Sequence, residues 1–447
     1  MVVQHNMQAA NANRMLNVTT SAQSKSTEKL SSGYRINRAA DDAAGLTISE
    51  KMRKQIKGLD RASTNAEDGV SAVQTAEGAL TEVHSMLQRM NELATQSANG
   101  TNSNTDRKAI QDEIDQLTTE IDRVSETTKF NETYLLKGDG AEKAHNVNAH
   151  DAGLDGVTLT DKGDTVDVTL KTLNAGDKVS IAGKNYTIGA TAADAQKIVD
   201  AQKVDGKTVT VNGTTYTYKT NQWTNADGSA ATVGGGAAGS ITIKGGDVVS
   251  DGTKTLTAMK DGADAAGADG IDDNDSTVIT AGKAYQLQTA EIVKASSIGT
   301  DTAAAVKNGA NADKDATATF TLNKGTVSYK DALSFNLHVG ADADMTNKIT
   351  VNIDSMNSAG LGVKGIKADT EQDATYAIDA IADAISTVSS QRSSLGAVQN
   401  RLEHTINNLD NVVENTTSAE SRIRDTDMAE EMVNYSKNNI LAQAGQS

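Results

Sequence analysis

The chain contains, between Met52 and Ala94, the segment MRKQIKGLDRASTNAEDGVSAVQTAEGALTEVHSMLQRMNELA. Apolar residues recur in it every seven positions, at Met52, Leu59, Ala66, Val73, Leu80, Leu87 and Ala94. A seven-residue apolar repeat is typical of a helix that packs along another helix. At about 1.5 Å per residue, the segment predicts a helix roughly 60 Å long. Such a helix requires a long partner surface.

A second amphipathic helix is expected to follow. Its apolar residues are spaced by four and three positions, which is the pattern of one helical face, at Ile110, Ile114, Leu117, Ile121 and Val124. We expect a left-handed Asn99-Gly100 pair to end the first helix. Asn104, Thr105 or Asp106 is expected to cap the second. The two helices should pack antiparallel.

The C-terminal region repeats this rhythm, at Ile381, Ile385, Val388, Leu395, Leu402, Ile406, Leu409 and Val413. Arg392 and Gln399 interrupt the series. These two residues either set the register of a helical rod or lie at its edge, since a long arginine side chain reaches solvent at little cost. The predicted seam of the rod consists of Leu59, Val73, Leu80, Leu87, Ile114, Ile121, Ile385, Arg392, Leu395, Gln399 and Leu402.

Both ends of the chain carry weaker apolar stripes. Val2, Ala9, Leu16 and Leu30 share one heptad position, which Gln23 breaks. In the C-terminal tail, Ala429, Val433 and Ile440 form a similar series. Marginal amphipathic helices are seldom stable alone in water. We therefore expect both ends to become ordered on assembly.

The middle of the chain has a different composition. Between about Gly140 and Asp331, Gly, Ala, Asp and Thr dominate and large apolar residues are few. Residues 208–218 alternate around Asn212-Gly213, and 179–188 repeat the pattern, which predicts β-hairpins. Short antiparallel strands are also expected at 240–244 and 317–329. A last strand pair is expected at 335–340 and 349–353.

The charge balance argues against one class of partner. The net charge is -17, whereas phosphate recognition needs clustered Lys and Arg, so we expect no nucleic-acid binding. Residues 1–61 are a local exception, with ten Lys or Arg and five Asp or Glu. A solvated helix face explains this local excess at least as well as a ligand does.

Several chemistries are also disfavoured. The 447 residues include no Pro and no Cys, which removes slow prolyl isomerisation, disulfides and cysteine-based metal sites. The six His residues form no H-E-x-x-H pair, which argues against a zinc peptidase. We expect no enzyme, metal or cofactor. No segment approaches the ~20 apolar residues of a membrane span, and no Sec-type signal is expected.

Motifs at both ends resemble those of bacterial flagellin, the filament subunit. They are, in chain order, LSSGYRIN at 30–37, AADDAAGL at 39–46, ELATQSANGT at 92–101, EIDRV at 120–124, LGAVQNRL at 395–402 and SAESRIRDTD at 418–427. The resemblance covers about residues 1–138 and 333–447. It leaves the middle as the family's hypervariable insert.

The combined prediction is a mainly α protein in which both termini form a long helical coiled-coil rod. Residues 1–40 and 416–447 are expected to form an inner core domain, and 41–138 and 333–415 the rod domain. Residues 139–332 are expected to form a surface-exposed variable insert, α+β and rich in strands.

The resemblance implies a homopolymeric filament for swimming. It also implies export through the flagellar type III channel to an extracellular flagellum. The implied partners besides the chain itself are the flagellar cap and hook-junction proteins and an export chaperone. Similar flagellins continue beyond residues 440–445 with another amphipathic stretch, whereas this chain ends at Ser447. Either the sequence is truncated there or the tail is naturally short, and we expect core packing and chaperone binding to depend on that difference.

The resemblance further implies recognition by Toll-like receptor 5. The residues at the matching positions are Gln88, Arg89, Leu93, Gln96 and Glu113. Arg89, Leu93 and Gln96 share one helical face by their spacing, and the same face is also suited to a subunit contact. Two alternative functions stay open. One is a hook-filament junction or other axial protein, and the other is a flagellin whose insert is an adhesin or an enzyme.

Overall fold

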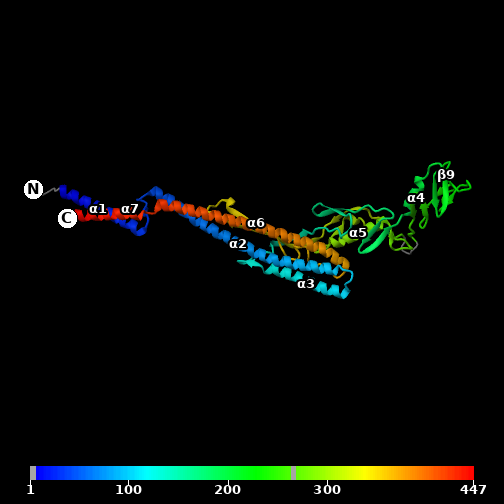
Figure 1. Ribbon diagram of the computed structural model, residues 1–447, viewed down its shortest axis with the longest axis horizontal. Helices are drawn as coiled ribbons and strands as arrows, with labels where there is room; N and C mark the ends of the chain where they lie inside the picture. Colours follow the sequence, from blue (N-terminus) through cyan, green and yellow to red (C-terminus); the bar gives the residue numbers. More distant parts are fainter. Residues whose placement is uncertain (1–6, 263–267, 447) are drawn as a thin grey trace. The chain divides into compact units, whose positions relative to one another are not determined.

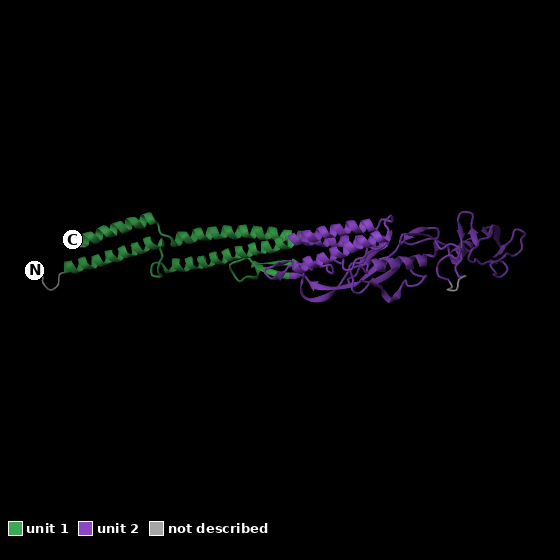
Figure 2. Ribbon diagram, turned by 90° about the horizontal axis from the view of Figure 1, so that it is seen from below, with its two compact units in different colours: residues 1–77, 334–352, 393–447 green, residues 78–333, 353–392 purple. Residues whose placement is uncertain are grey.

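The computed structural model describes residues 7–262 and 268–446. The chain folds as two compact units (Figure 2). Unit 1 consists of Met1–Glu77, Ser334–Asn352 and Ser393–Ser447, and unit 2 of Gly78–Leu333 and Ile353–Arg392. Residues 1–6 and 447, which belong to the predicted inner segments, lie outside the described residues, and so does Val2 of the N-terminal stripe.

Long helices occupy both ends of the chain (Figure 1). Unit 1 contains α1 (Met7–Ser32) and α7 (Met428–Gln446), unit 2 contains α3 (Asn104–Thr127), and α2 (Ala43–Ser97) and α6 (Glu371–Arg424) run through both. The helices predicted from the heptad spacing are confirmed. Most extend beyond their apolar stripe, because polar terminal turns carry no periodic signal.

In unit 1, α2 and α6 pack together with a two-stranded sheet. This sheet consists of β19 (Leu333–His338) and β20 (Lys348–Ile353), which confirms the predicted last strand pair. The core contains Leu59, Ala62, Ala66, Val339, Ile349, Leu402 and Leu409. Each large apolar side chain buried here contributes about 1.5–3 kcal/mol. If Gly69 carried a Cβ atom, that atom would lie 2.2 Å from Leu337 Cδ1 and would clash with it. The glycine therefore allows the sheet to approach α2.

In unit 2, the second part of α2 packs antiparallel to α3, as predicted (Figure 1). Both helices contribute buried side chains to the core, namely Leu80, Val83, Leu87, Met90 and Leu93 from α2 and Ile110, Ile114 and Ile121 from α3. The predicted caps were wrong in detail. Neither Asn99 nor Gly100 has a positive φ, and the N-cap of α3 is Ser103, in a capping box with Asp106.

The central insert of unit 2 consists of short strands and two helices. Its helices are α4 (Ala192–Ala201) and α5 (Ala281–Ala295). The strands in the first half, together with the small pair that precedes the insert, are β1 (Lys129–Phe130), β2 (Thr133–Tyr134), β3 (Asp139–Asn146), β4 (Thr158–Asp161), β5 (Thr165–Thr169), β6 (Lys178–Ile181), β7 (Lys184–Ile188), β8 (Thr208–Val211), β9 (Thr214–Lys219) and β10 (Gln222–Thr224). Those in the second half are β11 (Thr232–Val233), β12 (Ser240–Ile241), β13 (Val248–Ser250), β14 (Thr255–Thr257), β15 (Val278–Ile279), β16 (Ala305–Val306), β17 (Thr319–Asn323) and β18 (Thr326–Asp331).

Two separate cores stabilise the insert. One core lies against α5 and holds the sheets β16-β17-β5-β4 and β15-β7-β6. The other lies against α4 and the sheet β10-β9-β8-β13-β14. At the centre of the second core, Trp223 is fully buried and packs edge-on against Tyr218, with ring centroids 5.1 Å apart.

The two hairpins predicted in the insert are confirmed. β8 pairs with β9 through Asn212 and Gly213, whose φ angles are 52° and 81°, and β6 pairs with β7 through Ala182 and Gly183, at 52° and 73°. Two-residue turns of this kind need positive φ at both positions, which Asn and Gly adopt most readily.

Of the other two strand predictions in the insert, the one at 240–244 was wrong. Residues 240–244 contribute only the two-residue β12, which runs parallel to β11. The antiparallel strands expected at 317–329 are present, but they do not pair with each other: β17 pairs with β5 and β16, and β18 pairs with β3. β7 also pairs with β15 in parallel. Pairings between distant segments depend on tertiary packing, which alternation along the sequence does not encode.

Candidate assembly and recognition surfaces

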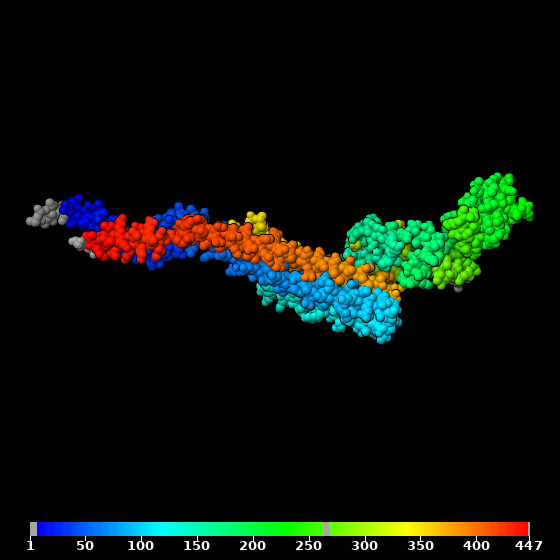
Figure 3. Space-filling model, in the orientation of Figure 1, coloured from blue at the N-terminus to red at the C-terminus, as the bar shows by residue number. Residues whose placement is uncertain are grey.

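The terminal helices α1 and α7 pack against each other in unit 1 (blue and red in Figure 3). Lys29 Nζ lies 3.7 Å from Glu431 Oε2 at one end, and Leu16 Cδ1 would lie 3.4 Å from a Cβ at Gly445 near the other. The helices are therefore antiparallel. Few of their side chains are buried by this pairing, among them Ser26 and Ala442.

Many large apolar side chains on this helix pair are exposed. α1 and α7 comprise 26 and 19 residues, yet they carry eight of the fifteen large hydrophobic side chains that are exposed among the described residues. These eight are Met7, Met15, Val18, Met428, Met432, Val433, Ile440 and Leu441. We call them the apolar end face. A concentration of exposed large apolar side chains on two helices indicates an interaction site.

Two of the sequence motifs meet beside this helix pair. Residues 30–37 and 418–427 are far apart in the sequence, but Tyr34 forms a bridge with Asp425. Arg35 N donates to Arg424 O at 2.7 Å, and Thr426 N donates to Gly33 O at 3.0 Å. The Arg424 guanidinium lies 4.5 Å from the centre of the Tyr34 ring. These contacts hold the connection between α1 and α2 next to the connection between α6 and α7.

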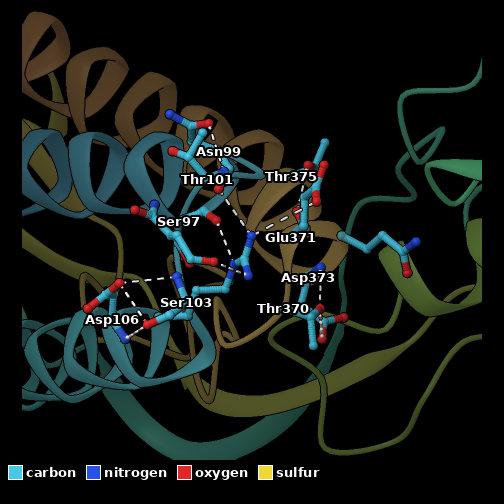
Figure 4. Close-up of polar contacts among 12 residues, drawn as sticks. Ser97, Asn99, Thr101, Ser103, Asp106, Thr370, Glu371, Asp373 and Thr375 are labelled. Carbon is cyan, nitrogen blue, oxygen red and sulfur yellow. Dashed lines mark hydrogen bonds and ion pairs between the residues drawn. The ribbon is translucent and has the colours of Figure 1, made fainter.

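The turn between α2 and α3, of which Figure 4 labels Ser97, Asn99 and Ser103, is organised by a buried arginine. Arg107 is 8% exposed, and its guanidinium donates to three backbone oxygens: those of Ser97 at 3.0 Å, Asn102 at 2.9 Å and Asn99 at 3.1 Å. It also lies 3.9 Å from Glu371 Oε2 on α6. No motif or repeat in the sequence points to this residue. The only feature of the sequence that could have indicated it is its position, one turn after the start of a capped helix.

Further bonds join this turn to the segment that precedes α6. Ser97 Oγ donates to Ala368 O at 2.5 Å. Gln111 Nε2 donates to Ile366 O at 3.0 Å, and Gln111 Oε1 accepts from Ala368 N at 2.6 Å. Ser97, Arg107 and Gln111 are all buried. Polar side chains that are satisfied in this way hold α2, α3 and α6 of unit 2 in one arrangement.

The residues at receptor-matching positions fall into two groups. Gln88, Arg89, Gln96 and Glu113 are exposed, whereas Leu93 is 2% exposed and belongs to the core. Leu93 therefore contributes little to any surface, although its spacing places it on the same face. Arg89 Nε donates to Glu113 Oε1 at 2.8 Å, and this bond and a second one to Glu92 raise the pKa of the Arg89 guanidinium. The pair joins α2 to α3 at the surface.

The predicted seam residues differ in burial. Leu59, Val73, Leu395 and Leu402 are buried in unit 1, and Leu80, Leu87, Ile114 and Ile121 in unit 2. Ile385, Arg392 and Gln399 are half-buried. The Gln399 amide donates to Glu403, one turn along the same helix, so this bond does not specify a register. The buried polar residue is instead Gln391, at 7% exposure, which was not predicted from the sequence.

The described parts of the chain suggest neither a metal site nor a membrane span. No three His, Asp or Glu side chains among residues 7–262 and 268–446 come together in a way that would hold a metal ion. Within the same ranges, the helices are too polar or too short to cross a bilayer.

The structure thus combines long helical ends, which carry exposed apolar side chains, with a sheet-bearing insert. Comparisons with known proteins agree. The model of the bacterial flagellin N-terminal helical region matches residues 3–141, and that of the C-terminal helical region matches residues 378–447. The chain is 41% identical to a flagellin of Clostridium tyrobutyricum, covering 100% of this chain and 97% of that protein. It is 35% identical to flagellin C of Vibrio cholerae, covering 100% and 94%.

The chain therefore belongs to the bacterial flagellin family, a family of structural proteins, and is a subunit that polymerises into the flagellar filament. This confirms the resemblance and the fold class predicted from the sequence. Among solved structures, FliC from Burkholderia pseudomallei is similar over 74% of this chain and 99% of that one, at 19% identity and a TM-score of 0.25. The family assignment rests on the sequence matches and not on this distant likeness.

Proposed function

We propose that the filament forms by burial of the apolar end face of α1 and α7 against the same helices of neighbouring copies. The observation that carries this proposal is the concentration of exposed hydrophobic side chains on these two helices, from Met7 at 78% to Leu441 at 49%. Burial of apolar surface is the main driving force for association. A subunit with two different complementary surfaces adds head to tail and gives an open helical polymer.

The proposal is tested by seeded elongation. Purified full-length protein is added to sonicated filament fragments, and growth is followed by electron microscopy and light scattering. Filaments that lengthen in proportion to added protein support the proposal. A compact monomer that never adds to the fragments contradicts it. In the cell, this polymer would be the extracellular flagellum, with the cap, hook-junction proteins and export chaperone as partners, and the insert would contribute no catalysis.

We further propose that the free monomer is recognised by Toll-like receptor 5. The supporting observation is the exposed Arg89–Glu113 pair, with Gln88 and Gln96 exposed beside it on α2. Leu93 is left out of this surface because it is buried.

Replacing Arg89 and Glu113 together by Ala is expected to reduce receptor signalling by monomer about tenfold or more, since removal of contacts at the centre of an interface costs upwards of ~1.4 kcal/mol. Reporter cells that express the receptor give the measurement. Arg123→Ala with Glu120→Ala removes another exposed ion pair of α3 and serves as the control. Unchanged signalling by the first variant would remove the proposal.

A further inference from the structure

Basic side chains form a stripe along the outer face of α2 in unit 1. They are Arg53, Lys54, Lys57 and Arg61, which we call the basic stripe. At ~100° of rotation per residue, these positions lie on the side of the helix opposite Leu59, Ala62 and Ala66, which are the buried ones. Lys54, Lys57 and Arg61 are exposed, and the Arg53 side chain is 42% exposed. The stripe therefore faces away from the core of its own unit.

The charges of the basic stripe are largely unneutralised within the monomer. Arg53 Nη1 lies 3.6 Å from Glu50, but among the described residues Lys54, Lys57 and Arg61 form no ion pair. The nearby tip of the β19–β20 hairpin carries Asp342 and Asp344, and it approaches the flank of α2 at Gly58, where a Cβ would lie 2.9 Å from Ala341 Cβ. Unpaired cations are notable in a chain whose net charge is -17.

An acidic stripe of similar length runs along α6 in the same unit. It consists of Glu403, Asp410 and Glu414, whose spacings of seven and four residues place them on one helical face. All three are exposed, and they flank the buried residues Leu402 and Leu409. Asp410 accepts a bond from Ser63 Oγ at 3.1 Å, and Glu403 accepts one from Gln399. Among the described residues, none of the three forms an ion pair.

We propose that the basic stripe of one copy docks on the acidic stripe of a second copy of this chain within the filament. The two stripes are opposite in charge and comparable in length, roughly 12 Å for residues 53–61 and roughly 16 Å for 403–414 at about 1.5 Å per residue. They are different surfaces of one chain, so their pairing is head to tail and leaves a free stripe of each kind. This inference rests on the assembly described above and adds its lateral electrostatic contact.

The test is a charge swap in seeded elongation of the full chain, measured as the critical concentration at low salt. Lys57→Glu with Arg61→Glu is expected to raise the critical concentration about tenfold, because attraction becomes repulsion at exposed sites. Glu403→Lys with Glu414→Lys is expected to do the same. The four substitutions together are expected to bring it back to within about threefold of the original. Wild-type growth should also weaken as salt rises.

The control is Lys219→Glu with Lys254→Glu. Both lysines are exposed in the insert and form no ion pair with any residue that the structure describes, and the change in net charge equals that of Lys57→Glu with Arg61→Glu. Far-UV circular dichroism of each monomer verifies that the helices persist. The stripes do not pair if the variant with all four substitutions grows no better than either double variant. The same conclusion follows if the control weakens growth as much as the double variants do. In both cases wild-type growth is unaffected, so the filament assignment stands. Absence of wild-type growth would overturn both proposals.

Discussion

Val433→Glu combined with Ile440→Glu is expected to abolish filament growth while leaving the monomer folded. The two side chains are seven residues apart on one face of α7 and are 68% and 67% exposed. Surface substitutions at such positions change monomer stability by less than about 0.5 kcal/mol. In the filament, burial of an unpaired carboxylate costs several kcal/mol, so ~4 kcal/mol per copy would raise the critical concentration about a thousandfold.

Seeded elongation measures this effect, and circular dichroism checks the monomer. The matched control is Val204→Glu, because Val204 is a valine of the insert with a comparable exposure of 58%. It is expected to polymerise normally. Growth of the α7 variant at the wild-type critical concentration would show that the apolar end face stays in contact with water in the filament, against the proposal.

Arg107→Met is expected to destabilise unit 2 by about 1–3 kcal/mol, because it leaves buried carbonyl oxygens without their hydrogen-bond donor. Methionine retains most of the aliphatic stem, so the loss comes from the guanidinium. Its three carbonyl partners, on Ser97, Asn99 and Asn102, would lose charge-assisted hydrogen bonds. Urea unfolding followed by circular dichroism gives the change in stability, and hydrogen exchange of the 98–103 amides locates it.

Arg123→Met on the same helix is the control for this experiment. Its ion pair with Glu120 is exposed, with side-chain exposures of 60% and 44%, and such surface pairs contribute at most about 1 kcal/mol. A loss at Arg107 no larger than that at Arg123 would mean that water replaces the guanidinium at the turn. The turn would then owe its geometry to its other bonds, among them the Ser103 cap and the bond from Ser97 to Ala368.

The strongest predictions from the sequence concerned elements whose signal is local and repeated. The heptads from Met52 to Ala94 located α2, and the spacing from Ile381 to Val413 located α6. Asn212-Gly213 located the β8–β9 hairpin because the required backbone angles favour these two residues. The helices α4 and α5 were not predicted as such, since they are short and lie in a segment dominated by Ala, Gly and Thr.

Site residues were harder to assign. Periodicity shows which residues share a helical face, but not whether another part of the protein buries that face. Leu93 shares its spacing with Arg89 and Gln96, yet Leu93 is buried and the other two are exposed. Gln391, and not the neighbouring Arg392, is the buried polar residue of α6. Arg107 has no repeat or motif of its own. Its three carbonyl partners come from a turn whose path depends on how α2 and α3 pack.

The sequence by itself determined the helical ends, the two hairpins and the family, because each of these depends on residues close together in the chain or on motifs kept in order. Only the tertiary structure decided which segments pair. In the tertiary structure, β17 and β18 lie in different sheets, and residues 30–37 contact residues 418–427. Large apolar side chains of α1 and α7 stay exposed. The physical reason is that burial and strand pairing are properties of contacts between distant segments, whose free energies no local spacing records.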